Sequence, residues 1–232
     1  MMLAILYDVH GNRPALEAVL GHAREQGAER FVLGGDYSAF GAWPVACVTI
    51  LRGLAETTWI RGNWERWQAE PGAVPDDAVL QSANAWVRSH LGDGLVAELA
   101  ALPPALVLGD TLFCHASPAS DIEPFGREPD PEGDDQLLAG VAQQRVVFGH
   151  THVQFQRSSA SGIELVNPGS VGLPWDGDVR AAYATLDEDA DAIALHRVEY
   201  DVDAASAALA KIGEPWTQRT RMRLERARFD AG

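Results

Sequence analysis

Seven residues of types that bind divalent metal ions stand at the ends of short apolar runs. They are two aspartates, four histidines and one asparagine: Asp8, His10, Asp36, Asn63, His115, His150 and His152. Carboxylate, imidazole and amide oxygen without a thiolate suit a borderline ion such as Mn²⁺, Fe²⁺ or Zn²⁺. Seven ligands exceed the needs of one tetrahedral ion, whereas two ions sharing a bridging carboxylate would use them all. Two ions roughly 3.5–4 Å apart are used in proteins for in-line displacement at phosphorus.

The spacing of these residues favours their convergence on one site. Asp8 lies two residues before His10, and His150 lies two residues before His152. Residues i and i+2 of an extended segment point to the same side, so each pair can reach one metal region. A glycine directly precedes three of the seven candidates, where a tight turn or a close backbone approach is needed. The other three histidines lie inside helix or strand patterns and are expected to be structural: His22, His90 and His196.

Each candidate ligand follows a short apolar run of the kind that forms a buried strand. The runs span residues 3–6, 31–33, 59–60, 112–114 and 146–148. Runs of this length that end in glycine or polar residues indicate strands of a sheet. In open α/β sheets, ligands collect beyond the carboxyl ends of such strands. The sequence therefore predicts that one sheet edge brings the seven residues together.

The two halves of the chain predict different strand arrangements. Asn12 can cap a helix that has Pro14 in its first turn and ends at Gly27, which makes a parallel βαβ unit with the flanking strands. Further helices are predicted over residues 44–53, 76–92 and 95–102, and three antiparallel hairpins over 106–114, 153–166 and 181–198. This pattern favours an α/β fold with two mixed β-sheets packed as a sandwich and helices on the outside, in a single domain over residues 1–232.

Two further segments have a distinctive composition. Residues 121–136 are rich in proline, glycine and acidic side chains, which predicts an exposed loop, with a flap over the site as the alternative. The basic tail from about residue 214 has arginines at positions 219, 221, 223, 226 and 228. For this tail we expect a surface helix that offsets acidic neighbours, with a binding patch as the alternative.

Composition narrows the classes of function. The chain has 232 residues, a formal net charge of -15 and two cysteines, Cys47 and Cys114. This charge argues against sliding along nucleic acid, because such binding depends on Lys and Arg at the phosphates. The apolar runs fall short of the roughly 18 residues that a membrane span needs. We interpret the N-terminal run as a core strand and the cysteines as buried free thiols, and we expect a cytoplasmic protein.

As a set, the motifs resemble the calcineurin-like metallophosphoesterase family, whose signatures are D-x-H, G-D, G-N-H-D/E, H and G-H-x-H. They stand here as Asp8-Val9-His10, Gly35-Asp36, Gly62-Asn63-Trp64-Glu65, His115 and Gly149-His150-Thr151-His152. Residues 8–20, 167–172 and 200–202 are similar to the bacterial branch that includes small cytoplasmic phosphodiesterases. The resemblance covers nearly the whole chain, to about Trp216.

The resemblance implies a dimetal site at one edge of two sheets sandwiched between helices. One ion would be held by Asp8, His10, Asp36 and His152, and the other by Asp36, Asn63, His115 and His150, with Asp36 bridging. A hydroxide bound to the ions would attack phosphorus, and catalytic roles fall to Asp36, Asn63 and His115. The expected cofactor is a pair of divalent ions, with Mn²⁺ as the first choice and Fe, Zn or Ni as alternatives.

One position departs from the family pattern. The family places a histidine after the metal-binding asparagine, and relatives suggest that it protonates the leaving oxygen or steadies the transition state. Trp64 stands there in this chain. Indole is a hydrogen-bond donor only and cannot transfer a proton near neutral pH. Its ring either covers one metal or stacks on a base of the substrate, and the sequence leaves both interpretations open.

We expect a dimetal phosphoesterase that hydrolyses phosphodiesters or small phosphorylated compounds. A phosphomonoesterase, a dinucleoside polyphosphatase and a nuclease are the alternative activities, and a weakly active metal-binding scaffold is the alternative class, because of Trp64. The expected partner is a small phosphorylated substrate, without long nucleic acid or membrane. Candidate substrate contacts next to the ligands are Asn12, Arg13, Tyr37, Trp64 and Arg66, although Arg13 and Arg66 could equally be ordinary surface residues.

Overall fold

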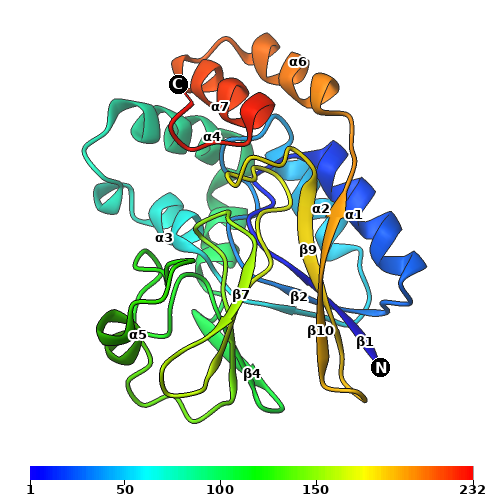
Figure 1. The fold of residues 1–232 in the computed structure, drawn as a ribbon. Coiled ribbons are helices and arrows are strands. Elements are labelled where there is room, and N and C mark those ends of the chain that lie inside the picture. Colours follow the sequence, from blue (N-terminus) through cyan, green and yellow to red (C-terminus); the bar gives the residue numbers. More distant parts are fainter. Residues whose placement is uncertain (232) are drawn as a thin grey trace.

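The alternation of side chains along strand β1 (Met2–Leu6) determines how the layers pack. In the computed structural model, which describes residues 1–231, Leu3 and Ile5 lie in one buried cluster and Ala4 and Leu6 in another. Successive side chains of a strand point to opposite faces, so both faces of the sheet around β1 are covered. One face packs against a second sheet and the other against helices (Figure 1).

The first sheet has five strands and mixes parallel with antiparallel pairs. Its order is β10 (Ala192–Val198), β9 (Ala181–Asp187), β1, β2 (Arg30–Leu33) and β3 (Thr57–Trp59). β1, β2 and β3 run parallel, with Ile5 opposite Val32, whereas β9 is antiparallel to both β1 and β10. The predicted βαβ unit and the last predicted hairpin therefore belong to the same sheet.

The second sheet also has five strands of mixed direction. Its order is β4 (Ala105–Leu108), β5 (Thr111–Cys114), β6 (Arg145–Val147), β8 (Glu164–Asn167) and β7 (Phe155–Ser158). β5, β6 and β8 run parallel, and β4 and β7 form the antiparallel edges. Phe113, Val147 and Val166 meet Ile5 and Val32 of the first sheet in the buried layer between the sheets. The predicted sandwich of two mixed sheets is confirmed.

Helices cover the two outer faces of the sandwich. Leu16, Val48 and Val87 pack on the first sheet, and Leu138 packs with Phe125 on the second. On the first face lie α1 (Arg13–Glu25), α2 (Pro44–Arg52) and α4 (Ala78–Ala100), and on the second α5 (Pro131–Leu137). The remaining helices are α3 (Asn63–Ala69), the short 3₁₀ helix Pro71–Ala73, α6 (Val202–Ile212) and α7 (Pro215–Arg226). Figure 1 shows α6 and α7 above the ends of the strands.

Local signals explain most of the helix ends. Asn12 caps α1 as predicted, since its side chain accepts a hydrogen bond from the Ala15 backbone N–H. The helices predicted over 76–92 and 95–102 form one element, α4, which breaks at Gly92, where φ is 73°. The short helix α3 was not predicted. Within residues 1–231, no helix is both long and apolar enough to cross a membrane.

The segment over residues 121–136 is more ordered than a predicted exposed loop. Its C-terminal part enters α5, because Asp130 caps the helix and Pro131 occupies the first position. The guanidinium of Arg157 forms two hydrogen bonds, of 2.6 and 2.8 Å, with the buried carboxylate of Asp134. Phe125 is buried against Phe148. The prediction of a loop was therefore wrong for residues 131–136, which are helical, although most of them are exposed as predicted.

The basic tail forms α7, and its charges meet acidic side chains. The Arg219 guanidinium lies 3.9 Å from the Asp77 carboxylate, and Arg221 lies 3.8 Å from Glu225. Both pairs are exposed and contribute little to stability. Cys47 and Cys114 are buried and unpaired, as predicted.

Candidate metal centre

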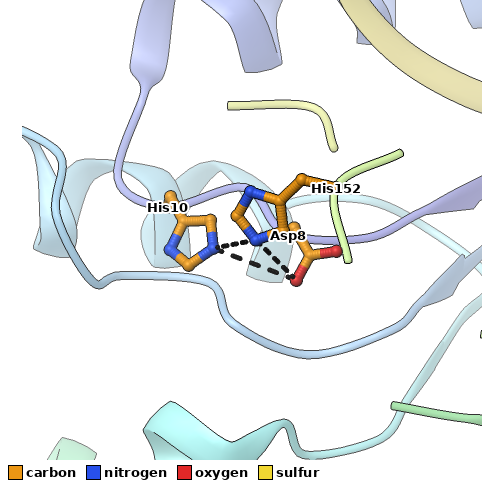
Figure 2. Close-up of side chains that lie close together, drawn as sticks. All are labelled: Asp8, His10 and His152. Carbon is orange, nitrogen blue, oxygen red and sulfur yellow. Dashed lines mark hydrogen bonds and ion pairs between the residues drawn. The ribbon is translucent and has the colours of Figure 1, made fainter. Parts of the chain in front are cut away.

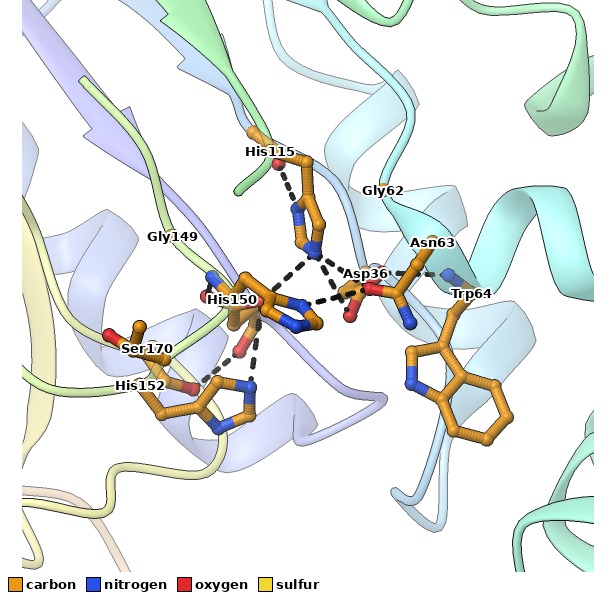
Figure 3. Close-up of polar contacts among 12 residues, drawn as sticks. Asp36, Gly62, Asn63, Trp64, His115, Gly149, His150, His152 and Ser170 are labelled. Atoms are coloured by element: carbon orange, nitrogen blue, oxygen red, sulfur yellow. Dashed lines mark hydrogen bonds and ion pairs between the residues drawn. The ribbon is translucent and has the colours of Figure 1, made fainter. Parts of the chain in front are cut away.

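The seven candidate ligands lie together where five strands end; Figure 2 shows Asp8 and His10 beside His152, and Figure 3 shows His152 with the remaining four. Backbone hydrogen bonds join the loops that carry them: Asp8 N–H donates to Gly35 O at 3.2 Å, and Gly149 N–H donates to His115 O at 2.7 Å. Asp8 and His10 follow β1, Asp36 follows β2, Asn63 begins α3 after β3, His115 follows β5, and His150 and His152 follow β6. The structure thus places all seven beyond strand ends, as the pattern predicts, but these strands belong to both sheets and not to one.

The ligand atoms form two adjacent groups. In each group the atoms lie within 4.8 Å of one another, and the members are Asp8, His10 and His152 in the first and Asp36, His115 and His150 in the second. Asn63 joins the second group, because its Oδ1 lies 2.9 Å from His115 Nε2 and 3.1 Å from His150 Nδ1. Asp36 Oδ2 lies 3.4 Å from His115 Nε2 and 3.8 Å from His10 Nε2, between the two groups.

Backbone carbonyls fix the orientation of three imidazole rings. The Nδ1–H of His10 donates to Ala39 O at 3.2 Å, that of His115 to Gly34 O at 2.9 Å, and that of His152 to Leu173 O at 2.5 Å. A carbonyl can only accept, so each contact requires the proton on Nδ1. Each Nε2 therefore points into the centre, an arrangement typical of metal-binding histidines.

The first group contains buried nitrogen and oxygen atoms that lack a partner and that a bound cation would satisfy. Nε2 of His10 and Nε2 of His152 lie 3.0 Å apart (Figure 2), and in the neutral rings neither has a proton to share. Asp8 Oδ1, 3.6 Å from His152 Nε2, is buried and has no hydrogen-bond partner within residues 1–231. Buried polar atoms are rarely left unpaired, and two nitrogen lone pairs with one carboxylate oxygen are suitable ligands for a divalent ion.

Burial determines the charge of the first group. It lowers the pKa of His10 and of His150 in the second group to about 4, and that of His152 well below its ordinary value. These rings are therefore neutral, as metal binding requires. Burial also raises the pKa of Asp8 to about 8; the charge of His115 acts against this rise, and the Asp36 carboxylate adds to it. A bound cation would restore the ionised form of Asp8.

The second group contains an opposed pair of charges. Burial acts to lower the pKa of His115, but the Asp36 carboxylate raises it to about 10. Burial acts on Asp36 in the opposite direction, and His115 and its neighbours hold the pKa of that carboxyl below its ordinary value. Asp36 is thus ionised, in the position from which one carboxylate can face both groups.

The backbone is strained at the candidate ligands. Five of the seven have φ in the left-handed region: Asp8 at 55°, His10 at 48°, Asp36 at 57°, His150 at 66° and His152 at 57°. Such conformations cost side-chain-bearing residues on the order of 1–3 kcal/mol each and cluster at functional sites. The predicted close approach at a glycine also occurs, since a Cβ on Gly35 would lie 2.4 Å from the Gly62 backbone nitrogen.

Glu65 supports the centre, and no role was assigned to it from the sequence. Its side chain is completely buried. Oε2 accepts hydrogen bonds from the backbone N–H groups of Asp36 and Gly62, each at 2.8 Å, and Oε1 accepts from that of Tyr37 at 2.9 Å. One carboxylate thus joins the loop after β2 to the loop after β3. The acidic position of the G-N-x-E motif was the available signal.

Trp64 lies beside the second group, but its ring points elsewhere. Its backbone N–H donates to Asp36 Oδ1 at 3.0 Å, whereas its indole points away from the histidines in Figure 3. The ring is 4% exposed and packs edge-on against Phe40 and Trp67, with centroid distances of 4.6 and 5.3 Å. This burial supports a packing role, and it leaves no free face for stacking on a substrate base.

The structure places the other predicted substrate contacts in two settings. Asn12 and Tyr37 are buried, and the fold uses their polar atoms: Asn12 Nδ2 donates to Gly172 O, and the Tyr37 hydroxyl lies 2.5 Å from Ile60 O. The other two pair with carboxylates: Arg13 with Glu17, and Arg66 with Asp121. Arg66 stands one turn along α3 from the candidate ligand Asn63 and remains partly exposed.

The fold and the paired ligand groups define a two-sheet domain with a candidate dimetal centre at the sheet edge. A model of the calcineurin-like phosphoesterase superfamily domain matches residues 1–191. The chain belongs to this family, as the motifs predicted. The members of this family are phosphoesterases, and divalent metal ions are their expected cofactors.

Similar proteins match nearly the full length. The uncharacterized protein MJ0912 of Methanocaldococcus jannaschii is 28% identical, with 90% of this chain and 92% of that protein covered. The crystal structure of a metallophosphoesterase from Sphaerobacter thermophilus is 28% identical with a TM-score of 0.82, covering 98% of this chain and 100% of that one. The hypothetical protein PH1004 from Pyrococcus horikoshii has a TM-score of 0.87 at 18% identity, covering 97% and 98%, and shares the fold.

Proposed function

We propose that the protein is a dimetal-dependent phosphoesterase that hydrolyses phosphodiesters or small phosphorylated compounds. The observation that carries the proposal is the arrangement of seven candidate ligands as two adjacent groups with Asp36 between them. Two ions bound there would supply a water nucleophile at neutral pH and positive charge for the phosphoryl oxygens. Mn²⁺ is our first choice of ion, and the net charge of -15 supports a small substrate over a long nucleic acid.

The residues of the chain orient and shield such a reaction. The carbonyl-bound rings of His10, His115 and His152 hold their Nε2 atoms in place without reorganisation. Among the seven candidates, His150 is the most exposed, so its side of the centre is where a substrate would enter. Trp64 cannot protonate a leaving oxygen, and its ring is turned away from the ligands. We therefore expect a preference for leaving groups that depart as stable anions.

Hydrolysis of aryl phosphodiesters tests the proposal. Metal-free protein loaded with Mn²⁺ is expected to bind two ions per chain and to hydrolyse a 4-nitrophenyl phosphodiester. Its rate should fall steeply across a series of phenyl diesters as the pKa of the leaving phenol rises, because no side chain at position 64 donates a proton. A parallel screen of phosphomonoesters and nucleotides ranks the substrate classes. Two bound ions without turnover of any ester, with every divalent ion tried, would favour a binding protein instead.

Restoring the family histidine at position 64 is expected to increase the rate of hydrolysis only slightly. The indole of Trp64 occupies an aromatic cluster with Phe40 and Trp67, so the smaller imidazole of Trp64→His would leave a void there. We expect lower thermal stability and a gain in kcat well below the roughly 10²–10⁴-fold that a positioned general acid contributes. Trp64→Phe, which keeps an apolar ring, is the control for lost packing. A gain in kcat within the general-acid range would show that the ring at position 64 can turn toward the substrate.

A further inference from the structure

Trp175 contacts a candidate ligand from outside the ligand set. Its indole stacks on the imidazole of His152, with the ring centroids 3.8 Å apart and the planes 17° from parallel. Its backbone N–H also donates to His152 O at 3.0 Å. Two residues earlier, Leu173 O accepts the Nδ1–H of the same ring at 2.5 Å. Residues 173–175 thus contact His152 in three ways: at the ring nitrogen Nδ1, at the face of the ring and at the backbone carbonyl.

These contacts constrain different motions of the ring. The hydrogen bond to Leu173 O fixes where Nδ1 lies, but it still allows the ring plane to tilt about that bond. A flat indole at stacking distance removes this freedom, so Nε2 keeps its direction toward Asp8 and His10. His152 also has a strained φ of 57°, which persists only where the surroundings hold it.

The C-terminal residues in turn hold Trp175. The Phe229 ring meets the indole edge-on at 4.8 Å, and the Arg223 guanidinium lies 4.2 Å from the Phe229 centroid and 5.6 Å from that of Trp175. The backbone is fixed as well, since Gly177 N–H donates to Ala227 O at 2.9 Å. Packing alone positions the indole, because its Nε1 is buried without a hydrogen-bond partner among the described residues. These C-terminal residues lie beyond the part matched by the family model, which ends at residue 191.

Among the described residues, no indole stacks on a ring of the second group, which Glu65 supports through the backbone of Asp36 and Gly62 instead. His115 is oriented by Gly34 O, and its ring meets that of His150 at a centroid distance of 5.3 Å. Its ligands lie on loops after β2, β3, β5 and β6, and none of the contacts of Trp175 or Phe229 described above reaches them. A change at Trp175 should therefore affect the two groups unequally.

We propose that Trp175 is a positioning residue for the first metal group, and that the C-terminal segment of residues 227–231 secures it by packing Phe229 against the indole. The inference rests on the proposed function, since it concerns the same dimetal centre. The proposal gives Phe229 and its neighbours, which lie outside the family match, a role at one of the two metal sites. The segment acts through Trp175, and neither ligand group contains any of its residues.

The chain contains a matched control for the stacking contact. The rings of Trp86 and His90 lie 3.9 Å apart, centroid to centroid, and are tilted by 32°. Both residues belong to α4 and lie outside the two ligand groups. Trp86→Ala therefore removes a similar half-buried indole from a histidine, at a similar cost in packing, without disturbing a candidate ligand.

Calorimetric titration of Mn²⁺ into full-length, metal-free protein tests the proposal. We expect two binding events in the wild type, of which His10→Ala identifies the one at the first group. Trp175→Ala should weaken that event by about 10–100-fold, the range found for residues that orient metal ligands, and leave the other unchanged. Trp175→Phe should weaken it less, Phe229→Ala should weaken the same event, and Trp86→Ala should change neither.

The outcomes separate this proposal from the one on which it rests. Fewer than two ions bound to the wild type would overturn the proposed dimetal function. Two events that keep their affinities in Trp175→Ala and Phe229→Ala, or that weaken equally, would overturn the positioning role alone. A lower unfolding temperature in Trp175→Ala with unchanged Mn²⁺ affinity would show that the indole is merely structural. If Trp175→Ala fails to fold, Trp175→Phe and Phe229→Ala decide the question.

Discussion

Asp36→Asn is expected to remove both metal ions and to abolish hydrolysis. Asp36 Oδ2 lies between His115 Nε2 and His10 Nε2, at 3.4 and 3.8 Å, so it is the atom best placed to serve both groups. Asparagine tolerates the φ of 57° at this position, so the substitution changes the ligand with little effect on the backbone. The loss in kcat/KM should exceed the roughly 10–100-fold that residues behind a ligand contribute. Metal content by mass spectrometry and diester hydrolysis measure the two effects.

Asp134→Asn is the matched control. Asp134 is also a buried aspartate, at 2% exposure, but it pairs with Arg157 next to the second sheet and belongs to neither ligand group. This variant should lose stability, because it leaves the Arg157 guanidinium with a neutral partner, and it should keep two ions. Retention of two ions and wild-type activity by Asp36→Asn would refute the bridging role of this carboxylate.

Glu65→Ala is expected to cause the largest loss of stability among the substitutions considered. Its removal leaves three backbone N–H groups, those of Asp36, Tyr37 and Gly62, without their acceptor in a fully buried place. A buried donor left unsatisfied costs about 1–3 kcal/mol, so three of them together are a large share of the stability of a domain. The free energy of unfolding, measured with urea on metal-free protein, gives the size of the loss.

Two variants calibrate that measurement. Glu65→Gln keeps one acceptor oxygen but turns an amide toward a backbone N–H, so it should fall between the wild type and Glu65→Ala. Glu17→Ala removes a glutamate that is 49% exposed and paired with Arg13 within α1, and it should cost under about 1 kcal/mol. Equal unfolding free energies for Glu65→Ala and Glu17→Ala would contradict the assigned role of Glu65.

The location of the candidate centre follows from local features of the sequence. Each ligand stands directly after a run whose apolar pattern and length indicate a strand, and parallel strands bring their carboxyl ends to one edge. The change from a parallel βαβ unit to antiparallel hairpins predicts the two sheets, and alternate residues of β1 lie in two buried clusters on its two faces. The family signatures then add which ligands share an ion.

The supporting residues depend on contacts that no local pattern encodes. Glu65 binds the backbone of Asp36 and Tyr37, 29 and 28 residues away, and backbone groups carry no sequence signature. Trp175 and Phe229 meet only because the chain returns to the sheet edge after α7. Trp64 shows the same limit, since the sequence leaves the direction of its ring open and the aromatic cluster around Phe40 determines it. The helix α5 was missed because proline and acidic residues indicate both a loop and a capped helix start.

At five of the candidate ligands the left-handed backbone lowers the stability of the fold, while the side chain there is needed to bind metal. Glycine would adopt those φ values without steric cost, so at Asp8, Asp36 or His152 it would relax the metal-free chain while deleting a ligand. Selection for folding alone would therefore favour variants that are more stable but bind fewer metal ions. A stabilised form of this protein obtained by directed evolution without a metal-dependent screen would be at risk of losing its centre first.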